Sequence, residues 1–167
     1  LERLLDPPSR ARRETLLEQA RAPYRDDPFD AAAAAAALIA NAQARAADAR
    51  ATEEARISEL DLSAREADQR VKRAARGAER EELLAQLEEL GAWYRDLVAV
   101  AVGAESAAIH VDKLAELRAD ATRERLLGAE AAAEAVRETW RALEELNLAP
   151  QLALEALFVR IGRELGA

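Results

Sequence analysis

The side chains that could perform acid–base chemistry in this sequence are carboxylates and a single histidine. Adjacent carboxylates occur at Glu53-Glu54, Glu81-Glu82, Glu88-Glu89 and Glu144-Glu145. Because neighbouring positions on a helix point in different directions, we expect these pairs to be solvated rather than catalytic. The histidine, His110, follows Ile109 and has no obvious Asp or Ser partner in the sequence. It is therefore predicted to be a loop residue at the edge of the fold.

Recognisable metal and cofactor sites are missing from the sequence. The chain contains no Cys, which excludes disulfide scaffolds, thiolate zinc sites and cysteine nucleophiles. One histidine cannot supply a His-rich metal centre, and no Glu-x-x-His pair occurs. The six glycines are isolated, so there is neither a phosphate-binding loop nor a dinucleotide fingerprint. We therefore expect no catalytic residues, no cofactor, no metal and no enzymatic activity.

The segment Trp93-Tyr94-Arg95-Asp96 is the most informative group of polar and aromatic residues. Tyr94 lies on an apolar stripe and is predicted to be partly buried, whereas Trp93 lies off it. Neither Arg95 nor Asp96 has an oppositely charged residue three or four positions away. Both charges therefore face solvent, form an ion pair across a helix packing, or contact another subunit. Trp140 lies on a second stripe, where the core is the first interpretation and a binding interface the second.

Helices must position all of these residues. Leu, Ala, Glu and Arg dominate the sequence, and alternating β-type patterns are missing. Apolar residues three and four apart predict three buried helix faces. These faces are Leu83, Leu87, Leu90, Tyr94, Leu97 and Ala101; then Leu126, Ala129, Ala133, Val136, Trp140 and Leu143; then Leu154, Leu157, Phe158, Ile161 and Leu165. The predicted fold class is all-α, an antiparallel helical bundle with a long Ala-rich helical hairpin.

Capping residues and prolines set the expected element boundaries. The residues expected at helix starts are Ser9, Asp30, Ser63 with Glu66 in a capping box, Thr122 and Pro150. Gly103 and Asn147 are expected to end helices, and Gly77 to interrupt the longest one. The expected organisation is the end of a preceding lid-like helical region (1–22), a linker (23–29) and a C-terminal helical domain (30–167). Residues 30–80 are a hairpin that either projects or folds back.

The charge balance bears on the class of partner. The chain has 167 residues, with 24 basic and 32 acidic side chains and a net charge of −8. An acidic domain is not expected to bind DNA strongly as a whole, because affinity for DNA comes largely from neutralised phosphates. No apolar run is long enough to span a membrane. The first residue is Leu and no signal region follows, so we expect a fragment or processed chain of a cytoplasmic protein.

Several segments of the sequence resemble a known family. Leu90-Gly-Ala-Trp-Tyr-Arg-Asp-Leu97, followed by Gly103-Ala104 and Val111-Asp112, resembles the C-terminal domain of delta-prime subunits of the bacterial DNA polymerase III clamp loader. The closing segment 146–157, with Asn147, Pro150 and Glu155, is similar to the end of that domain. Residues 4–13 resemble the end of the small AAA+ lid domain, and residues 30–80 look like the elongated hairpin of actinobacterial members.

The resemblance implies a non-catalytic oligomerisation domain that helps to load the sliding clamp during DNA replication. Its partners would be the gamma/tau and delta subunits, through a helical collar, and the parent complex would be ATP-driven. A Ser-Arg-Cys finger and a Cys-rich zinc module cannot occur without Cys. The alternatives are the collar of a sister subunit or a free-standing helical adaptor that self-dimerises. The candidate interface or structural residues are Trp93, Tyr94, Arg95, Asp96, Trp140, Asn147 and Glu155.

Overall fold

Every regular element in the described part of the chain is helical. The computed structural model describes residues 7–146 and 148–166. Its α-helices are α1 (Pro7–Arg21), α2 (Ala31–Ile57), α3 (Ala64–Ala101), α4 (Leu114–Asp120), α5 (Leu126–Glu145) and α6 (Pro150–Leu165). Short 3₁₀ turns are η2 (Ala22–Tyr24), η3 (Glu105–Ala107) and η4 (Val111–Lys113). The all-α prediction is confirmed. None of these helices combines the length and the apolar character that a membrane crossing requires.

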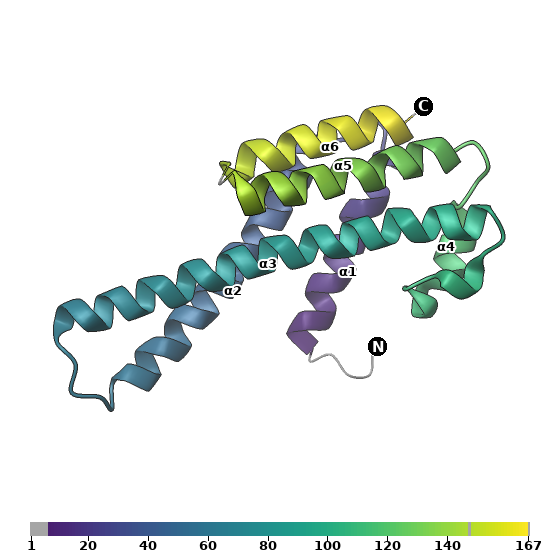
Figure 1. The fold of residues 1–167 in the computed structure, drawn as a ribbon. Coiled ribbons are helices and arrows are strands. Elements are labelled where there is room, and N and C mark those ends of the chain that lie inside the picture. The colour runs from purple at the N-terminus through teal and green to yellow at the C-terminus, as the bar shows by residue number, and fades with distance from the viewer. Residues whose placement is uncertain (1–6, 147, 167) are drawn as a thin grey trace.

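The long helix α3 organises the molecule. Its 38 residues extend over about 57 Å. The second half of α3 packs against α5, and α6 lies beside α5, whereas α2 runs antiparallel to the first half (Figure 1). The successive helices α2, α3, α5 and α6 alternate in direction, as an antiparallel bundle requires. The predicted long hairpin is formed by α2 and α3, and its tip lies well beyond the other helices in Figure 1.

The core sits around the second half of α3. Leu87, Leu90 and Tyr94 are fully buried there, as the predicted stripe requires. All of the residues predicted to be buried on α6 are buried, which confirms that face. Helix α5 contributes mainly small buried residues, including Gly128 and Ala132, so its backbone lies close to its neighbours.

Helix α1 belongs to the same core. Leu16, Leu17 and Ala20 are buried in one cluster with the residues of α3, α5 and α6. The segment that follows α1 is also packed, because Pro23 is buried and the Phe29 ring lies 6.2 Å from the Phe158 ring. Residues 7–21 therefore share their hydrophobic core with the rest of the described chain.

Most predicted helix ends are confirmed. The Asp30 carboxylate accepts the Ala33 N–H at 2.9 Å, and Ser63 and Glu66 form the reciprocal capping box. Gly103 follows the end of α3 with φ of 81°, a conformation that glycine adopts without a Cβ clash. Pro150 occupies the first turn of α6, where its missing N–H costs nothing.

Other predicted boundaries are wrong. Helix α1 begins at Pro7 and not after Ser9, because proline is compatible with a first helical turn. The Thr122 hydroxyl accepts the Arg125 N–H at 3.3 Å within a turn, and α5 begins only at Leu126. Helix α3 continues without interruption through Gly77, since neighbouring helix formers outweigh one glycine. The predicted stop at Asn147 lies outside the described residues.

A polar contact marks the place where the hairpin leaves the bundle. The buried Gln86 side chain donates to the Leu38 carbonyl at 3.1 Å and accepts from Asn41 at 3.2 Å. On the bundle side of this contact, Ala34 and Leu38 of α2 are buried. Towards the tip α2 buries nothing after Ala42 among its described residues, so that part is held only by its partner in the hairpin.

Candidate functional site

The Trp93-to-Asp96 segment lies at the junction of α1, α3 and the loop after α3. Trp93, Tyr94 and Asp96 are each at most 1% exposed, whereas Arg95 points outward. The Tyr94 hydroxyl donates to the Ala20 carbonyl of α1 at 2.9 Å. The other two buried side chains take part in separate polar clusters, which we name the Asp96 network and the Asp120 network.

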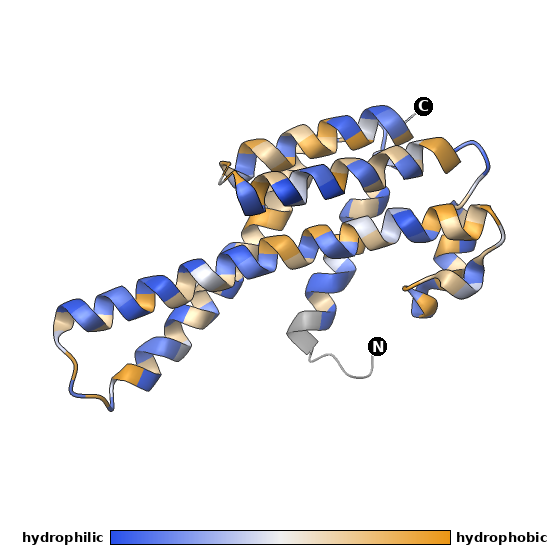
Figure 2. Cartoon of the chain, in the orientation of Figure 1, coloured by the Kyte–Doolittle hydropathy of each residue, from blue (hydrophilic) through white to orange (hydrophobic). Residues whose placement is uncertain are grey.

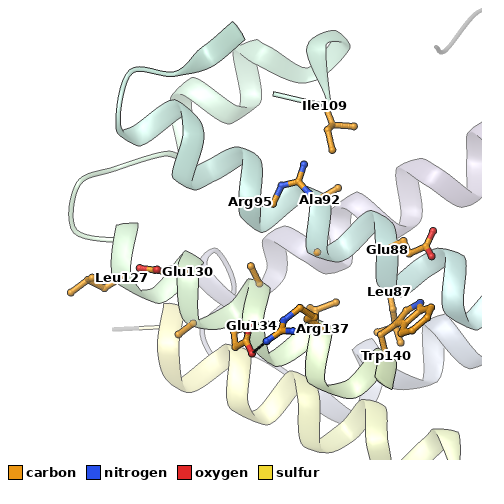
Figure 3. Close-up of a pocket in the computed structure, with 14 residues that line it drawn as sticks. Leu87, Glu88, Ala92, Arg95, Ile109, Leu127, Glu130, Glu134, Arg137 and Trp140 are labelled. Atoms are coloured by element: carbon orange, nitrogen blue, oxygen red, sulfur yellow. Dashed lines mark hydrogen bonds and ion pairs between the residues drawn. The ribbon is translucent and has the colours of Figure 1, made fainter. Parts of the chain in front are cut away.

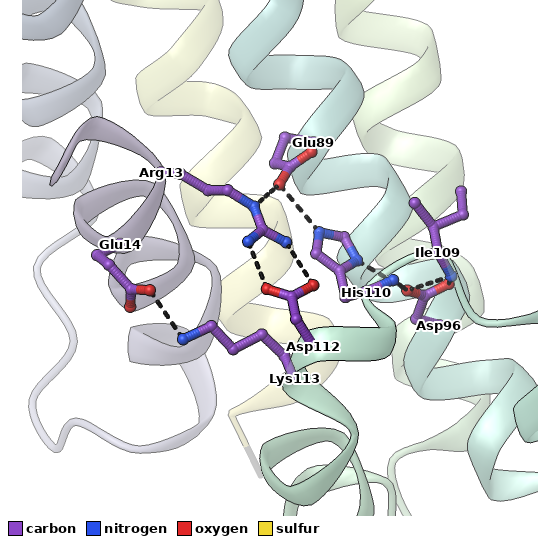
Figure 4. A network of polar contacts seen from close by, with 8 residues as sticks. All are labelled: Arg13, Glu14, Glu89, Asp96, Ile109, His110, Asp112 and Lys113. Atoms are coloured by element: carbon purple, nitrogen blue, oxygen red, sulfur yellow. Dashed lines mark hydrogen bonds and ion pairs between the residues drawn. The ribbon is translucent and has the colours of Figure 1, made fainter. Parts of the chain in front are cut away.

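The Asp96 network begins with a buried carboxylate that binds the loop. Both Asp96 oxygens accept the Ile109 N–H, at 3.0 and 2.9 Å, and Oδ2 also accepts the His110 N–H at 2.8 Å. The same Oδ2 lies 2.7 Å from His110 Nδ1. His110 is fully buried, and its ring lies edge-on to the Trp93 ring, with 5.5 Å between the two ring centroids. One side chain of α3 therefore binds the loop at two successive residues (Figure 4).

The network continues from the imidazole to α1 through Glu89 and Arg13. His110 Nε2 lies 3.1 Å from Glu89 Oε1, and Arg13 Nε donates to the same oxygen at 2.7 Å. The remaining guanidinium nitrogens of Arg13 donate to the two carboxylate oxygens of Asp112, at 2.6 and 3.2 Å. Figure 4 shows the resulting chain of alternating charges, which joins α1, α3 and the turn η4.

The charges in this network shift each other's pKa. Burial alone lowers the pKa of His110, but the hydrogen bonds and charges of Glu89 and Asp96 outweigh it and raise the pKa above the ordinary 6.5. The hydrogen bond with His110 lowers the pKa of Glu89 despite partial burial, and Arg13 adds to that effect. The Arg13 hydrogen bond likewise lowers the pKa of Asp112. The geometry therefore favours a protonated imidazole whose two N–H groups both donate.

This arrangement predicts that the protein loses stability as the pH rises above neutrality. A group whose pKa is higher in the folded state stabilises fully below its unfolded pKa of about 6.5, and that contribution disappears as the pH passes the folded value. We expect the free energy of unfolding in urea to fall between pH 6 and pH 9. His110 is the single histidine of the chain, so its ring-proton NMR signal reports the folded pKa directly.

The matched control is His110→Asn, which retains a side-chain donor near the position of Nδ1 but does not titrate. Its stability is expected to be nearly constant between pH 6 and pH 9. The carboxylates with lowered pKa act in a different window, below about pH 4.5, because their contribution is lost only as the pH falls. An equal slope in the wild type and in the His110→Asn variant would contradict a charged imidazole.

The Asp120 network fixes the other side of Trp93. Asp120 is buried and accepts from Arg21 Nε at 2.7 Å, from the Tyr24 hydroxyl at 2.9 Å and from Arg25 at 3.1 Å. Burial raises the pKa of Asp120, but its donors outweigh burial and the net shift is downward. Trp93 Nε1 donates to the Tyr24 oxygen at 3.1 Å, so both networks meet at one indole.

Both nitrogens of the His110 ring are engaged within the Asp96 network. His110 is enclosed, and both ring nitrogens already face carboxylates, so no proton position is open to an external substrate. Within residues 7–146 and 148–166, no group of three or more His, Cys, Asp or Glu side chains is placed to hold a metal ion. Together, the two networks join α1 and the 104–113 loop to α3.

This geometry corrects the sequence predictions for Trp93, His110, Glu89 and Tyr94, and it decides between the alternatives left open for Asp96. Trp93 is buried because α1 and the loop cover a second face of α3, so the buried arc is wider than one stripe. Asp96 does not face solvent but binds the loop, and His110 is a buried partner of Asp96 and not an edge residue. Glu89 is held between Arg13 and His110 rather than solvated. Tyr94 is fully buried, beyond the predicted partial burial.

The second candidate feature is an open apolar groove between α3 and α5, shown in Figure 3, which we name the α3–α5 groove. Its volume is about 870 Å³. It is lined by Leu87, Gly91, Ala92, Ala131, Ala133, Val136 and Trp140, by the charged residues Glu88, Arg95, Glu130, Glu134 and Arg137, and at its edges by Ile109 and Leu127. Leu127 is 76% exposed and Ile109 51%, so large apolar side chains extend this surface into solvent.

The remaining candidate residues fall into different places. Arg95 and Trp140 line the α3–α5 groove, and Trp140 is half-buried with an indole N–H that has no partner in the described structure. Arg95 is therefore separated from Asp96, which lies on the buried side of α3. Glu155 is half-buried on α6 and accepts from Gln151. Asn147 lies outside the described residues, so the structure does not place it.

The partners within the Asp96 network could not be found from helical spacing. Asp96 and His110 are 14 residues apart across an irregular loop, and Arg13 and Asp112 are 99 apart. The available signal was the lack of in-helix partners for Asp96, which left an external contact open.

Comparison with known proteins adds no assignment, because no protein-family model, no curated protein sequence and no solved structure matches this chain.

Proposed function

We propose that this chain is a non-catalytic assembly domain that binds other proteins through the α3–α5 groove. The observation that carries the proposal is the position of Leu127, which stands 76% exposed at the edge of an apolar groove with a charged rim. Apolar surface of this kind, rimmed by polar groups, is typical of protein interaction sites. Trp140 and Arg95 in the lining belong to the residue types that dominate binding energy at interfaces.

The Asp96 network supports this proposal because it holds one edge of the groove. The Asp96 carboxylate fixes Ile109, which lies on the edge of the groove, by accepting its backbone N–H. A partner that docks there would meet a preformed surface, and preformed surfaces bind with a smaller loss of conformational entropy. The His110 imidazole is enclosed, and both of its ring nitrogens are already hydrogen-bonded to carboxylates. These features suit a residue that supports the edge of the groove better than they suit a catalytic residue.

For the identity of the partners we propose other clamp-loader subunits, gamma/tau and delta. This part of the proposal rests on the sequence resemblance of the 90–97, 103–112 and 146–157 segments to delta-prime collar domains. The chain would then help to assemble the complex that loads the sliding clamp during DNA replication. A self-dimerising adaptor is the competing proposal, and the same groove would serve it.

Light scattering after size exclusion tests the proposal with the chain alone and mixed with the gamma/tau collar. We expect a heteromeric complex at micromolar concentration, and the Leu127→Glu variant is expected to weaken it by about tenfold or more. Charge reversal at Arg95 is expected to weaken the complex to a smaller degree, because rim charges contribute less.

Leu152→Glu is the matched control, since Leu152 is 68% exposed on α6 and does not line the groove. It should leave the complex intact. A homodimer abolished by Leu127→Glu, without binding to gamma/tau, would assign the groove to self-association. The absence of any oligomer, or an equal loss in both variants, would overturn the groove assignment.

A further inference from the structure

The projecting half of α3 carries a row of exposed positive charge. Five basic residues and one glutamine lie within one arc of the helix, because most of them are three or four residues apart in the sequence. They are Arg65, Gln69, Lys72, Arg73, Arg76 and Arg80, all exposed, and we name them the basic stripe. The stripe is about 22 Å long, from the 15 steps of about 1.5 Å between residues 65 and 80. Figure 2 shows this half of α3 as predominantly hydrophilic.

The basic stripe is the continuation of the face on which α3 packs against the bundle. The same spacing of three and four leads from Arg80 to the buried residues Leu83 and Leu87. Helix α5 ends beside Arg80, whose guanidinium donates to the Glu144 side chain at 2.8 Å. Beyond that contact, no helix among residues 7–146 and 148–166 covers this face, and its side chains are mostly arginines.

Apart from Arg80, which is paired with Glu144, the charges of the stripe are available for binding. Within the described residues, Arg65, Arg73 and Arg76 form no ion pair or hydrogen bond with another side chain, and Lys72 is paired only with the exposed Asp68. A Cβ placed at Gly77, on the flank of the stripe, would have no atom within 4 Å. A partner can therefore approach the helix backbone closely there.

We propose that the basic stripe binds the phosphate backbone of duplex DNA without reading its sequence. Each arginine guanidinium can form two parallel hydrogen bonds with the oxygens of a phosphate group. A stripe about 22 Å long spans about six base pairs of a duplex, at 3.4 Å each. No aromatic residue occurs between Phe29 and Trp93, and single strands are usually held by stacking on aromatic rings, which favours a duplex. The stripe has no large apolar side chain to anchor an acidic protein segment.

The net charge of −8 does not prevent such a contact, because of where the stripe lies. Arg73 is about 15 Å along the helix from Leu83, where the bundle begins. That distance exceeds the screening length of about 8 Å at physiological ionic strength, so the acidic residues of the bundle are screened from the stripe. Glu66, Asp68 and Glu79 lie on the same segment of α3 and weaken the positive field locally. The binding is expected to be weak, confined to the basic stripe and strongly dependent on salt. It is compatible with a chain that does not bind DNA strongly as a whole, and it is independent of the assembly proposed above.

Fluorescence anisotropy of a labelled 20-base-pair duplex with the full chain tests this inference. We expect binding at 50 mM KCl that weakens steeply by 200 mM. The triple variant R65Q/R73Q/R76Q is expected to lower the affinity by tenfold or more at 50 mM KCl. It should also reduce the slope of log affinity against log salt by about 2–3, since each phosphate contact contributes about 0.9.

The matched control is R123Q/R141Q/R163Q, which removes the same charge from exposed positions on the bundle. It should retain most of the wild-type affinity, and circular dichroism should show both triple variants folded. No wild-type binding at 50 mM KCl, or an equal loss in the two variants, would overturn the proposal. Tighter binding of poly-L-glutamate than of the duplex would reassign the stripe to an acidic protein partner.

Discussion

Replacing Asp96 by alanine is expected to lower the free energy of unfolding by about 3–5 kcal/mol. The carboxylate is 1% exposed and binds the Ile109 N–H, the His110 N–H and His110 Nδ1. Its removal leaves two backbone donors and a charged ring buried without this acceptor, and such groups are costly to leave unsatisfied. Urea unfolding followed by circular dichroism measures the change.

The neighbouring position offers a matched control. Arg95→Ala removes an exposed charge one residue away and is expected to change the free energy of unfolding by less than about 0.5 kcal/mol. Asp96→Asn retains one acceptor oxygen for the loop and is expected to lose less than Asp96→Ala. Equal losses in the Arg95→Ala and Asp96→Ala variants would show that the Asp96 network does not hold the loop.

The second large effect is expected at Gly128, where α5 meets the end of α6. A Cβ at this position would overlap the Glu164 carbonyl oxygen and lie 3.1 Å from Leu165 Cδ2. A carbonyl oxygen cannot turn aside as a flexible side chain can, so the helices must separate. We expect Gly128→Ala to cost about 2–3 kcal/mol in unfolding free energy, despite the better helix propensity of alanine.

The Gly77→Ala variant is the matched control, because it changes helix propensity without changing the packing between helices. Gly77 is exposed in the middle of α3, and a Cβ there meets nothing within 4 Å. The substitution is therefore expected to stabilise the protein by about 0.5–1 kcal/mol. Thermal unfolding of both variants checks the opposite signs. Stabilisation by Gly128→Ala would show that α5 and α6 are not in close contact at this point.

Local features of the sequence predict the helices well. The step of three and four from Leu83 to Leu97 identifies a buried face because the α-helix has 3.6 residues per turn. Asp30 and Ser63 identify helix starts because each carboxylate or hydroxyl satisfies an N–H only two or three residues away. Such interactions lie within one helical turn, so they can be read without the fold.

The polar contacts of the candidate site are of a different kind. The sequence indicates that Asp96 needs a partner outside its helix, but it does not indicate that His110 is that partner. Whether two residues meet across an irregular loop depends on its path, and here Gly103 and the turns η3 and η4 set that path. The same holds for Arg13 and Asp112, which meet only because α1 packs on α3.

The sequence by itself therefore determined the helical class, the buried face of α6, one buried face of α3 and most helix ends, since helix propensity and side-chain period are local properties. On α5 the predicted face was only partly right, because Leu126, Ala133 and Trp140 are half-buried and Gly128, Ala132 and Ala135 are buried instead. The tertiary structure decided which faces of α3 are covered and by what. It separated Arg95, on the open α3–α5 groove, from Asp96, in the buried network, although the two are adjacent in the chain. Burial depends on where other helices end, and α5 ends beside Arg80, which leaves the basic stripe uncovered.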